Sequence, residues 1–462
     1  MMSTRRPLAA LAPVLALAIA AAAPAQPAPW SLRWNGPADR HDEPIKLLAG
    51  ADGSSLGLAR SDLASPLPGQ QRLALLRYAP DGTAAWTMVD PLLESSEFVE
   101  PAIALAGASD AVLAAYTGAT LVLRRVRLSD GGTIWQRERP LAPHLPDRRP
   151  PRIAVDVGTG AVLVAVADGT ALRVLRWRAD GEALLPDLQL AVPDQVLQPG
   201  AIVAGPDGEV VVAVWERSLD AGSGNLVVGF AADGALRFQN REPGPLGNQF
   251  DPPRMVGAGD GTVTLLGHSE STCGVPQQLL WRLDRDGVRQ WLRSWPDAPC
   301  SGSTPAALGV LPDGAVMVVH TRIGSAIRMG ANRYRADGSL DWSRSWQGGP
   351  PAFGAAAFDG AADAGGGVIA VGAESLPGSI GRLAFAHWTA DGGLCGHGQD
   401  AQGSRATSAA SDGGGGWLLA GYGRGLAPGS AATDVLLHRL PAAPVCAADP
   451  LFRNGFEGDG SN

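Results

Sequence analysis

The chain has very few lysines, cysteines, tyrosines and histidines for its 462 residues. Lys46 is the only lysine, and the sequence holds 4 cysteines, 4 tyrosines and 7 histidines. Asp and Glu (45) outnumber Lys and Arg (37), which gives a formal net charge of -8. An acidic chain repels phosphate backbones and anionic lipid, so we expect neither nucleic acid nor a membrane surface among its partners.

Motifs for metal-dependent or cofactor chemistry are also missing. The sequence contains no C-x-x-C pair, no two adjacent cysteines and no H-E-x-x-H, and its histidines are scattered. The densest polar cluster is His41-Asp42-Glu43, a weak metal candidate that we interpret as solvated loop charges. The function therefore has to be argued from the fold.

The only long apolar run lies at the N-terminus. Arg5 and Arg6 precede a run from Leu8 to Ala23, and Ala23-Pro24-Ala25 has the pattern of a cleavage site. We predict a signal peptide over residues 1–25, whose removal takes the net charge from -8 to -10. A membrane anchor is the alternative, but the run is short and Ala-rich. We expect a secreted or periplasmic protein without a membrane span.

The four cysteines form an even set in a chain that we predict to be exported, which favours disulfides. Three pairings are possible. We favour Cys273 with Cys300, which flank one predicted hairpin, and Cys395 with Cys446, which would tie the C-terminal tail to a blade. Zinc is the alternative, but no histidine has ligand spacing.

Asp-Gly pairs between strand-like runs are the most regular feature of the chain. They begin at Asp81, Asp130, Asp180, Asp233, Asp286, Asp337 and Asp391, 49 to 54 residues apart, and in five of the seven an aromatic follows the Asp by five positions. A weaker hairpin signal lies between successive pairs, so one unit contains two hairpins. A period near fifty residues built from hairpins indicates a β-propeller with one four-stranded antiparallel blade per unit.

We assign each Asp-Gly pair to a type I′ turn, in which Gly adopts positive φ without steric cost. The aromatic falls on the outer strand, and its regular recurrence favours packing between blades over sugar binding. The residues assigned to turns and packing are Asp81, Gly82, Trp86, Asp130, Gly131, Trp135, Asp233, Gly234, Phe238, Asp286, Gly287, Trp291, Asp337, Gly338 and Trp342.

The weaker hairpin signal occurs eight times, and its last unit lacks a fourth strand. The third strand of that unit is predicted at Asp434 to Leu440, and Trp30 to Trp34 can supply the fourth. We predict an all-β, eight-bladed propeller over residues 26–440, closed by the N-terminal strand, because an open ring would leave two bare edges. Seven blades are the alternative, since the outer strand after Asp391 is degraded.

The segments DGTAAW, DGVRQW and DGSLDW resemble the tryptophan-docking repeat of propellers of the pyrroloquinoline-quinone type, which commonly have eight blades. LSDGGTIW is also similar to the Asp-box of secreted sialidases. Quinoprotein dehydrogenases carry a vicinal cysteine pair over the cofactor, which this chain lacks. The resemblance therefore implies the fold, and we expect no quinone cofactor.

The C-terminal segment, residues 441–462, resembles the short ending of many secreted proteins of GC-rich gammaproteobacteria. We expect its two phenylalanines to dock on the propeller, with an export or processing signal as the alternative. The matching residues are Cys446, Asp449, Leu451, Phe452, Asn454, Gly455, Phe456 and Glu457.

Two functions follow from these patterns. The first is a monomeric, noncatalytic platform that binds a protein or a glycan, without a cofactor. The alternative is a hydrolase or lyase whose residues come singly from several blades; a pocket at the channel mouth in which carboxylates or arginines converge would favour it. Calcium is the one ion worth considering, and Asp284 and Asp286 are the closest pair of acids in an Asp-Gly loop.

Overall fold

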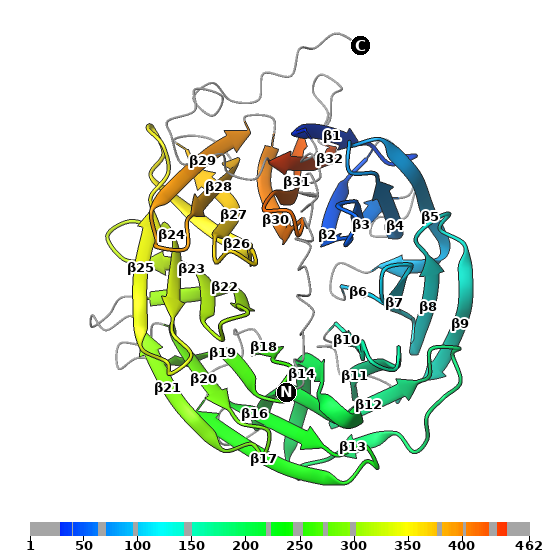
Figure 1. Ribbon diagram of the computed structural model, residues 1–462. Helices are drawn as coiled ribbons and strands as arrows, with labels where there is room; N and C mark the ends of the chain where they lie inside the picture. Colours follow the sequence, from blue (N-terminus) through cyan, green and yellow to red (C-terminus); the bar gives the residue numbers. More distant parts are fainter. Residues whose placement is uncertain are drawn as a thin grey trace, which may run out of the picture.

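The protein is a ring of eight antiparallel sheets with four strands each (Figure 1). Our computed structural model describes residues 28–38, 40–62, 71–95, 100–142, 150–218, 223–243, 253–270, 276–295, 302–376, 381–400, 403–424 and 432–440. The prediction of an all-β, eight-bladed propeller is confirmed, and the seven-bladed alternative is wrong. The predicted signal peptide and C-terminal tail lie outside the described residues.

Blades 1 to 7 each contain four consecutive strands, ordered from the channel to the rim. Blade 1 contains β2 (Asp42–Ala49), β3 (Ser55–Asp62), β4 (Gln71–Tyr78) and β5 (Ala84–Ser95). Blade 2 contains β6 (Ala102–Leu105), β7 (Asp110–Thr117), β8 (Thr120–Arg127) and β9 (Thr133–Pro140). Blade 3 contains β10 (Arg152–Val155), β11 (Val162–Asp168), β12 (Ala171–Trp177) and β13 (Leu188–Leu190).

Blades 4 to 7 repeat this order. Blade 4 contains β14 (Gln195–Ala204), β15 (Val210–Ser218), β16 (Ser223–Phe230) and β17 (Leu236–Pro243). Blade 5 contains β18 (Arg254–Gly257), β19 (Val263–Glu270), β20 (Pro276–Leu283) and β21 (Arg289–Trp295). Blade 6 contains β22 (Gly302–Val310), β23 (Val316–Ile323), β24 (Arg328–Tyr334) and β25 (Leu340–Trp346). Blade 7 contains β26 (Gly354–Ala362), β27 (Val368–Ser375), β28 (Arg382–Trp388) and β29 (Leu394–Asp400).

Blade 8 joins the two ends of the chain. It contains β30 (Gly403–Ser411), β31 (Trp417–Arg424), β32 (Thr433–Leu440) and, at the rim, β1 (Trp30–Trp34). β1 pairs antiparallel with β32, with Trp30 opposite Arg439 and Trp34 opposite Val435. The prediction that the N-terminal strand closes the ring is confirmed.

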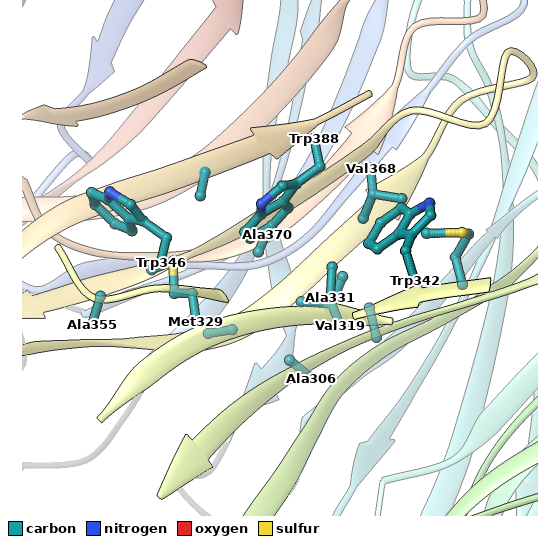
Figure 2. Close-up of a cluster of buried hydrophobic side chains, with 14 of the residues drawn as sticks. Ala306, Val319, Met329, Ala331, Trp342, Trp346, Ala355, Val368, Ala370 and Trp388 are labelled. Carbon is teal, nitrogen blue, oxygen red and sulfur yellow. The ribbon is translucent and has the colours of Figure 1, made fainter. Parts of the chain in front are cut away.

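The hydrophobic core is divided into eight clusters, one at each interface between neighbouring blades. Figure 2 shows the cluster between blades 6 and 7, where Trp342 and Trp346 from β25 lie close to Trp388 from β28. Each blade is covered on both faces, so its middle strands are apolar on both sides; the first five residues of β11 are all buried.

Helical structure is almost absent. The only helical element in the described part of the chain is a short 3-10 turn, η1 (Pro206–Gly208). None of the residues described forms a helix that is long and apolar enough to cross a membrane.

The two faces of the ring carry different connections. Connections between first and second strands, and between third and fourth strands, leave from one face, which we call the turn face. All the Asp-Gly pairs singled out above lie there. Connections between second and third strands, and from each rim strand to the next blade, leave from the opposite face, which we call the loop face. Every inner strand therefore runs from the loop face to the turn face.

The Asp-Gly turns differ from the predicted type I′ geometry. In all seven copies only the Gly has positive φ, as in Gly82 with a φ of 86°, whereas a type I′ turn needs positive φ at both central residues. Gly82 N donates to Ala79 O at 3.0 Å, and Ala79 N donates to Thr83 O at 2.8 Å. This is the pattern of a type I turn followed by a left-handed Gly, so the type I′ assignment was wrong.

Candidate functional site

The inner strands share an irregularity around the central channel. In five of them, one residue bulges out of the pairing with the second strand: Ile45, Gly200, Ala306, Phe358 and Thr407. In the three short inner strands the corresponding residue is the first of the strand: Ala102, Arg152 and Arg254. We call these eight residues the bulge ring.

Proline accounts for most of the bulge ring. It lacks an N–H group, so it disturbs the pairing ladder and is tolerated at bulges and strand starts. A proline directly precedes six of the eight positions: Pro44, Pro101, Pro151, Pro199, Pro253 and Pro305.

A cavity of about 430 Å³ is lined by six residues of the bulge ring and by residues close to them. Together the lining residues come from blades 1 to 5, 7 and 8. Its lining reaches Glu43 and Arg254 at the starts of inner strands, so it opens toward the loop face; we call it the channel mouth. The charged lining residues are Lys46, Arg60, Arg152, Arg254, Arg405, Glu43, Glu100 and Asp359. Five cations thus face three carboxylates, although the chain as a whole is acidic.

Two of the three carboxylates are bound to cations. Arg60 Nε donates to Glu43 Oε2 at 3.0 Å, across the pairing of β2 with β3. Lys46 Nζ lies 3.1 Å from Asp359 Oδ2 and links blade 1 to blade 7. After these two pairs, Arg254 and Arg405 are lining cations that form no ion pair with a carboxylate of the described chain.

Arg405 lies close to two aromatic rings. Its guanidinium carbon lies 5.3 Å from the ring centre of Phe358 and 5.1 Å from that of Tyr422, its partner across β30 and β31. The buried Nε of Arg405 has no hydrogen-bond partner among the described residues. Burial raises the pKa of Tyr422, so this phenol remains neutral beside the arginine. Contacts with two rings restrict the position of a guanidinium, and its N–H groups can still donate to an anion.

The opposite wall carries the other two arginines. Arg152 and Arg254 occupy the bulge-ring positions of blades 3 and 5, and Gly200 occupies the position between them in blade 4. Arg254 forms no ion pair with a carboxylate of the described chain. The third acid of the lining, Glu100, is exposed.

The predicted aromatic residues lie at blade interfaces on the turn face. The indole N–H groups of Trp86, Trp135, Trp291 and Trp342 donate to Leu128, Ala179, Ala336 and Ala390 of the next blade, at 2.8 to 3.0 Å. Trp30 makes the same bond, at 3.0 Å, to Pro80 across the ring closure. Phe238 lies over Gly287 in the same way but cannot donate.

Each ring lies on the glycine of the next Asp-Gly pair. A Cβ at Gly338 would be 2.6 Å from the Trp291 ring, and one at Gly82 would be 2.8 Å from the Trp30 ring. Glycine is therefore required for two reasons: the backbone has positive φ, and the ring lies too close to leave room for a side chain. The same holds for Gly131 beneath Trp86, while Gly234 lies beneath Leu188. Six of the seven Asp side chains also accept a bond from the backbone N–H two residues on: Asp81, Asp130, Asp180, Asp233, Asp337 and Asp391.

The missing aromatic of blade 7 has a topological reason. Blade 8 has no turn between its third and fourth strands, because β32 and β1 come from opposite ends of the chain. Gly396 of β29, five residues after Asp391, therefore has no Asp-Gly turn to cover. The degraded outer strand that suggested seven blades follows from the way in which the eighth blade is completed.

The remaining candidates do not converge. Asp42 is buried and accepts from Gly36 N, Glu43 pairs with Arg60, and His41 Nδ1 lies 3.4 Å from Thr433 Oγ1. No group of three His, Cys, Asp or Glu suited to a metal occurs in the part of the chain that is described.

The predicted calcium pair is engaged by the protein itself. Asp284 Oδ1 accepts from Asp286 N at 3.0 Å and from Val288 N at 2.8 Å. Asp286 pairs with Arg237 at 2.8 Å. The two carboxylates thus stabilise a turn and a contact between blades.

The disulfide pairings stay predictions. Cys395 lies on β29, whereas Cys273, Cys300 and Cys446 lie outside the described residues.

Two arrangements that resemble serine-hydrolase chemistry are structural. Ser55 stands in GSSLG, the G-x-S-x-G spacing of a nucleophile, but it is the buried first residue of β3 and pairs with Tyr78. Ser303 Oγ lies 3.0 Å from His320 Nδ1, yet it also contacts Thr321 O at 3.1 Å and is fully buried. Burial lowers the pKa of His320 to about 4. This group of residues satisfies polar atoms inside blade 6.

A second cavity, of about 540 Å³, lies on the turn face between blades 3 and 4. Its arginines are occupied: Arg178 pairs with Glu182 at 3.1 Å, and Arg176 donates to Ala232 O at 2.9 Å and to Pro186 O at 3.1 Å. The channel mouth is smaller, but it gathers charged side chains from many blades, so we regard it as the functional site.

No protein-family model and no curated protein matches the chain. Among solved structures, it is similar to the Dos1 propeller, with a TM-score of 0.53 and 10% identity over 88% of this chain and 95% of that one. A quinohemoprotein alcohol dehydrogenase from Pseudomonas putida HK5 gives a TM-score of 0.46 at 11% identity, over 87% of this chain and 78% of that one. The WD40 domain of Toxoplasma gondii coronin gives 0.46 at 10% identity, over 90% and 87%. The similarity to the Dos1 propeller shows the propeller fold, and none of the three says anything about ligand or chemistry.

Sequence analysis named Glu43 and Lys46 for other reasons and missed the other residues of the channel mouth. Those residues come from strands of different blades, and none of them belongs to a motif. The recurring proline at the start of the inner strand is the signal that could have found them, because it marks the same position in six blades.

Proposed function

We propose that the protein is a noncatalytic platform that binds an anionic ligand in the channel mouth. The observation that carries the proposal is the surplus of cations there: five basic side chains and three carboxylates, two of which are neutralised by Arg60 and Lys46. Concave sites of this size suit small ligands better than a flat protein surface. A basic site in an acidic protein also attracts an anion locally while the rest of the surface repels it.

Calorimetric titration with trigalacturonate, an acidic trisaccharide, and with neutral maltotriose tests this function. We expect heat of binding from trigalacturonate alone, and a lower affinity at higher salt, because salt screens partly exposed charges. Equal binding of maltotriose would contradict the proposal. So would the absence of any response to trigalacturonate, inorganic phosphate and sulfate.

A hydrolase or lyase is the second candidate, because carboxylates and arginines converge at the channel mouth. It ranks lower because Glu43 and Asp359 are tied in ion pairs, which leaves only Glu100 among the lining carboxylates for acid or base chemistry. Prolonged incubation with trigalacturonate distinguishes the two. New reducing ends or an unsaturated product would establish an enzyme, and intact ligand after saturable binding would support the platform.

A further inference from the structure

The cations of the channel mouth lie on two opposite walls. Arg405, Lys46 and Arg60 belong to blades 8 and 1, whereas Arg152 and Arg254 belong to blades 3 and 5. In Figure 1 the inner strand β30 of blade 8 lies across the channel from β14 of blade 4. A ligand that uses both walls therefore has to span the channel.

The first wall presents one fixed cation. Lys46 and Arg60 are neutralised by Asp359 and Glu43, so Arg405 provides the net charge of this wall. The rings of Phe358 and Tyr422 lie 5.3 and 5.1 Å from its guanidinium carbon and restrict its movement. An arginine held in this way offers its in-plane N–H groups to a planar carboxylate.

The second wall presents Arg254, which forms no ion pair with a carboxylate of the described chain. Gly200, in the bulge of blade 4, has no side chain and lines the cavity between the bulge-ring positions of blades 3 and 5. A carboxylate beside Gly200 would therefore lie next to Arg254. The two walls together therefore suit a ligand with two negative groups.

The lining favours a sugar over an acidic peptide. Phe358 is 40% exposed at the bulge and offers an apolar surface next to Arg405. A peptide would most readily bind by adding a strand to a free sheet edge. Five of the eight inner strands bulge in their pairing with the second strand, so their backbones are too irregular to be good templates for strand addition.

We infer that the channel mouth binds a short acidic oligosaccharide with carboxylates on two of its sugars, one held by Arg405 and the other by Arg254. This inference rests on the proposed anion-binding function and specifies its ligand. The chain as a whole is acidic and repels a long polyanion, so a short oligosaccharide or a chain end is the fitting ligand.

Titration of the protein with galacturonate, digalacturonate and trigalacturonate tests the inference. We expect one of the two oligomers to bind at least about tenfold more tightly than the monomer. Arg254→Ala and Arg405→Leu should each lower that affinity by about 10- to 100-fold, because each removes a charge-assisted contact. They should change affinity for the monomer less. Arg178→Ala, on the turn face, is the matched control and should change nothing.

A steric variant tests whether binding needs the space beside Gly200 as well as the charges of the arginines. Gly200→Leu fills this space and leaves every charge in place, so we expect it to weaken binding of the oligomers as strongly as Arg254→Ala does. Melting temperatures establish that each variant is folded. If Arg405→Leu is destabilised, Arg405→Lys replaces it, because lysine keeps the charge but loses the planar donor edge.

The outcomes distinguish this inference from the proposed function. Equal affinity for galacturonate and both oligomers, or an unchanged affinity in Arg405→Leu, would overturn the two-wall ligand while anion binding remains. Equal binding of the dipeptide Glu-Glu would overturn the assignment to a sugar. Absence of binding by every galacturonate and by phosphate would overturn both.

Discussion

The turn face and the channel mouth are built from the same eight blades, but they use repetition differently. On the turn face, five indoles make one hydrogen bond each, in the same geometry, to the next blade. Around the channel, the eight equivalent bulge-ring positions hold six residue types, from Gly200 to Arg254, and six of these positions line the channel mouth. Packing between identical neighbours requires the same residue each time, whereas a ligand that is not eightfold symmetric requires different ones. In this propeller, repetition marks stability, and departure from repetition marks the candidate site.

The largest expected effect tests the repeated contact. Trp342 is 6% exposed, packs between blades 6 and 7 and donates to Ala390 O. Trp342→Ala should lower the free energy of unfolding by about 3 to 5 kcal/mol, through the cavity and the lost hydrogen bond. Urea denaturation measures this. Leu340→Ala, on the same strand but 52% exposed, should cost less than about 0.5 kcal/mol; equal costs would show that the indole has no special role.

A glycine beneath an indole should be the next most sensitive position. Gly82→Ala places a methyl group 2.8 Å from the Trp30 ring at a φ of 86°. Gly413 has a φ of 75° but nothing within 4 Å of the added Cβ, so Gly413→Ala isolates the backbone strain. We expect a loss of about 1 kcal/mol for Gly413→Ala and of about 2 to 4 kcal/mol for Gly82→Ala, by urea denaturation. Similar losses would mean that the ring closure does not depend on close docking of Trp30.

A third prediction concerns pH. Burial raises the pKa of Asp42 from 3.8 to about 6, so the folded state prefers the protonated carboxyl. Its contribution to stability is complete below pH 4 and is lost as the pH rises through 6. Between pH 4 and 8, ionisation of Asp42 should lower the free energy of unfolding by on the order of 2 kcal/mol, and Asp42→Asn should abolish this loss. Melting temperatures between pH 4 and 8 should fall more steeply for the native protein than for the variant; parallel curves would contradict this.

The smallest effect on stability is expected at the channel mouth. Arg254→Ala should change the free energy of unfolding by less than about 0.5 kcal/mol, because this side chain forms no ion pair with a described residue. The same variant should lose most of its anion affinity. If Arg254→Ala lowered stability substantially and left binding unchanged, the channel mouth would serve stability, as the turn face does, and would not be a binding site.

The repeated part of the molecule could be predicted from the sequence, because one blade repeats the contacts of the next. The predicted strand from Trp30 to Trp34 has the bounds of β1, and the third strand of blade 8 begins at Thr433, one residue before the predicted start. The turn type was wrong because the Asp-Gly pair alone does not reveal that a third residue takes part in the loop. The channel mouth could not be predicted as a site, since residues such as Arg254 and Arg405 come to line the same cavity only when the ring closes.

The pairing of β1 with β32 sets an order of events during synthesis. Arg33 contacts Asp434, 401 positions later in the chain, so the first strand of the propeller to leave the ribosome waits for the last. Until β32 is available, Trp30 is not held over Gly82 in the Asp81 turn, and the sheet edges that β1 and β32 would share stay unpaired. Loop closure over such a distance adds little to the final free energy, because its entropy grows only with the logarithm of loop length. The consequence is kinetic. Until the last strand has been synthesised, the ring is open and its unpaired sheet edges can pair with other chains.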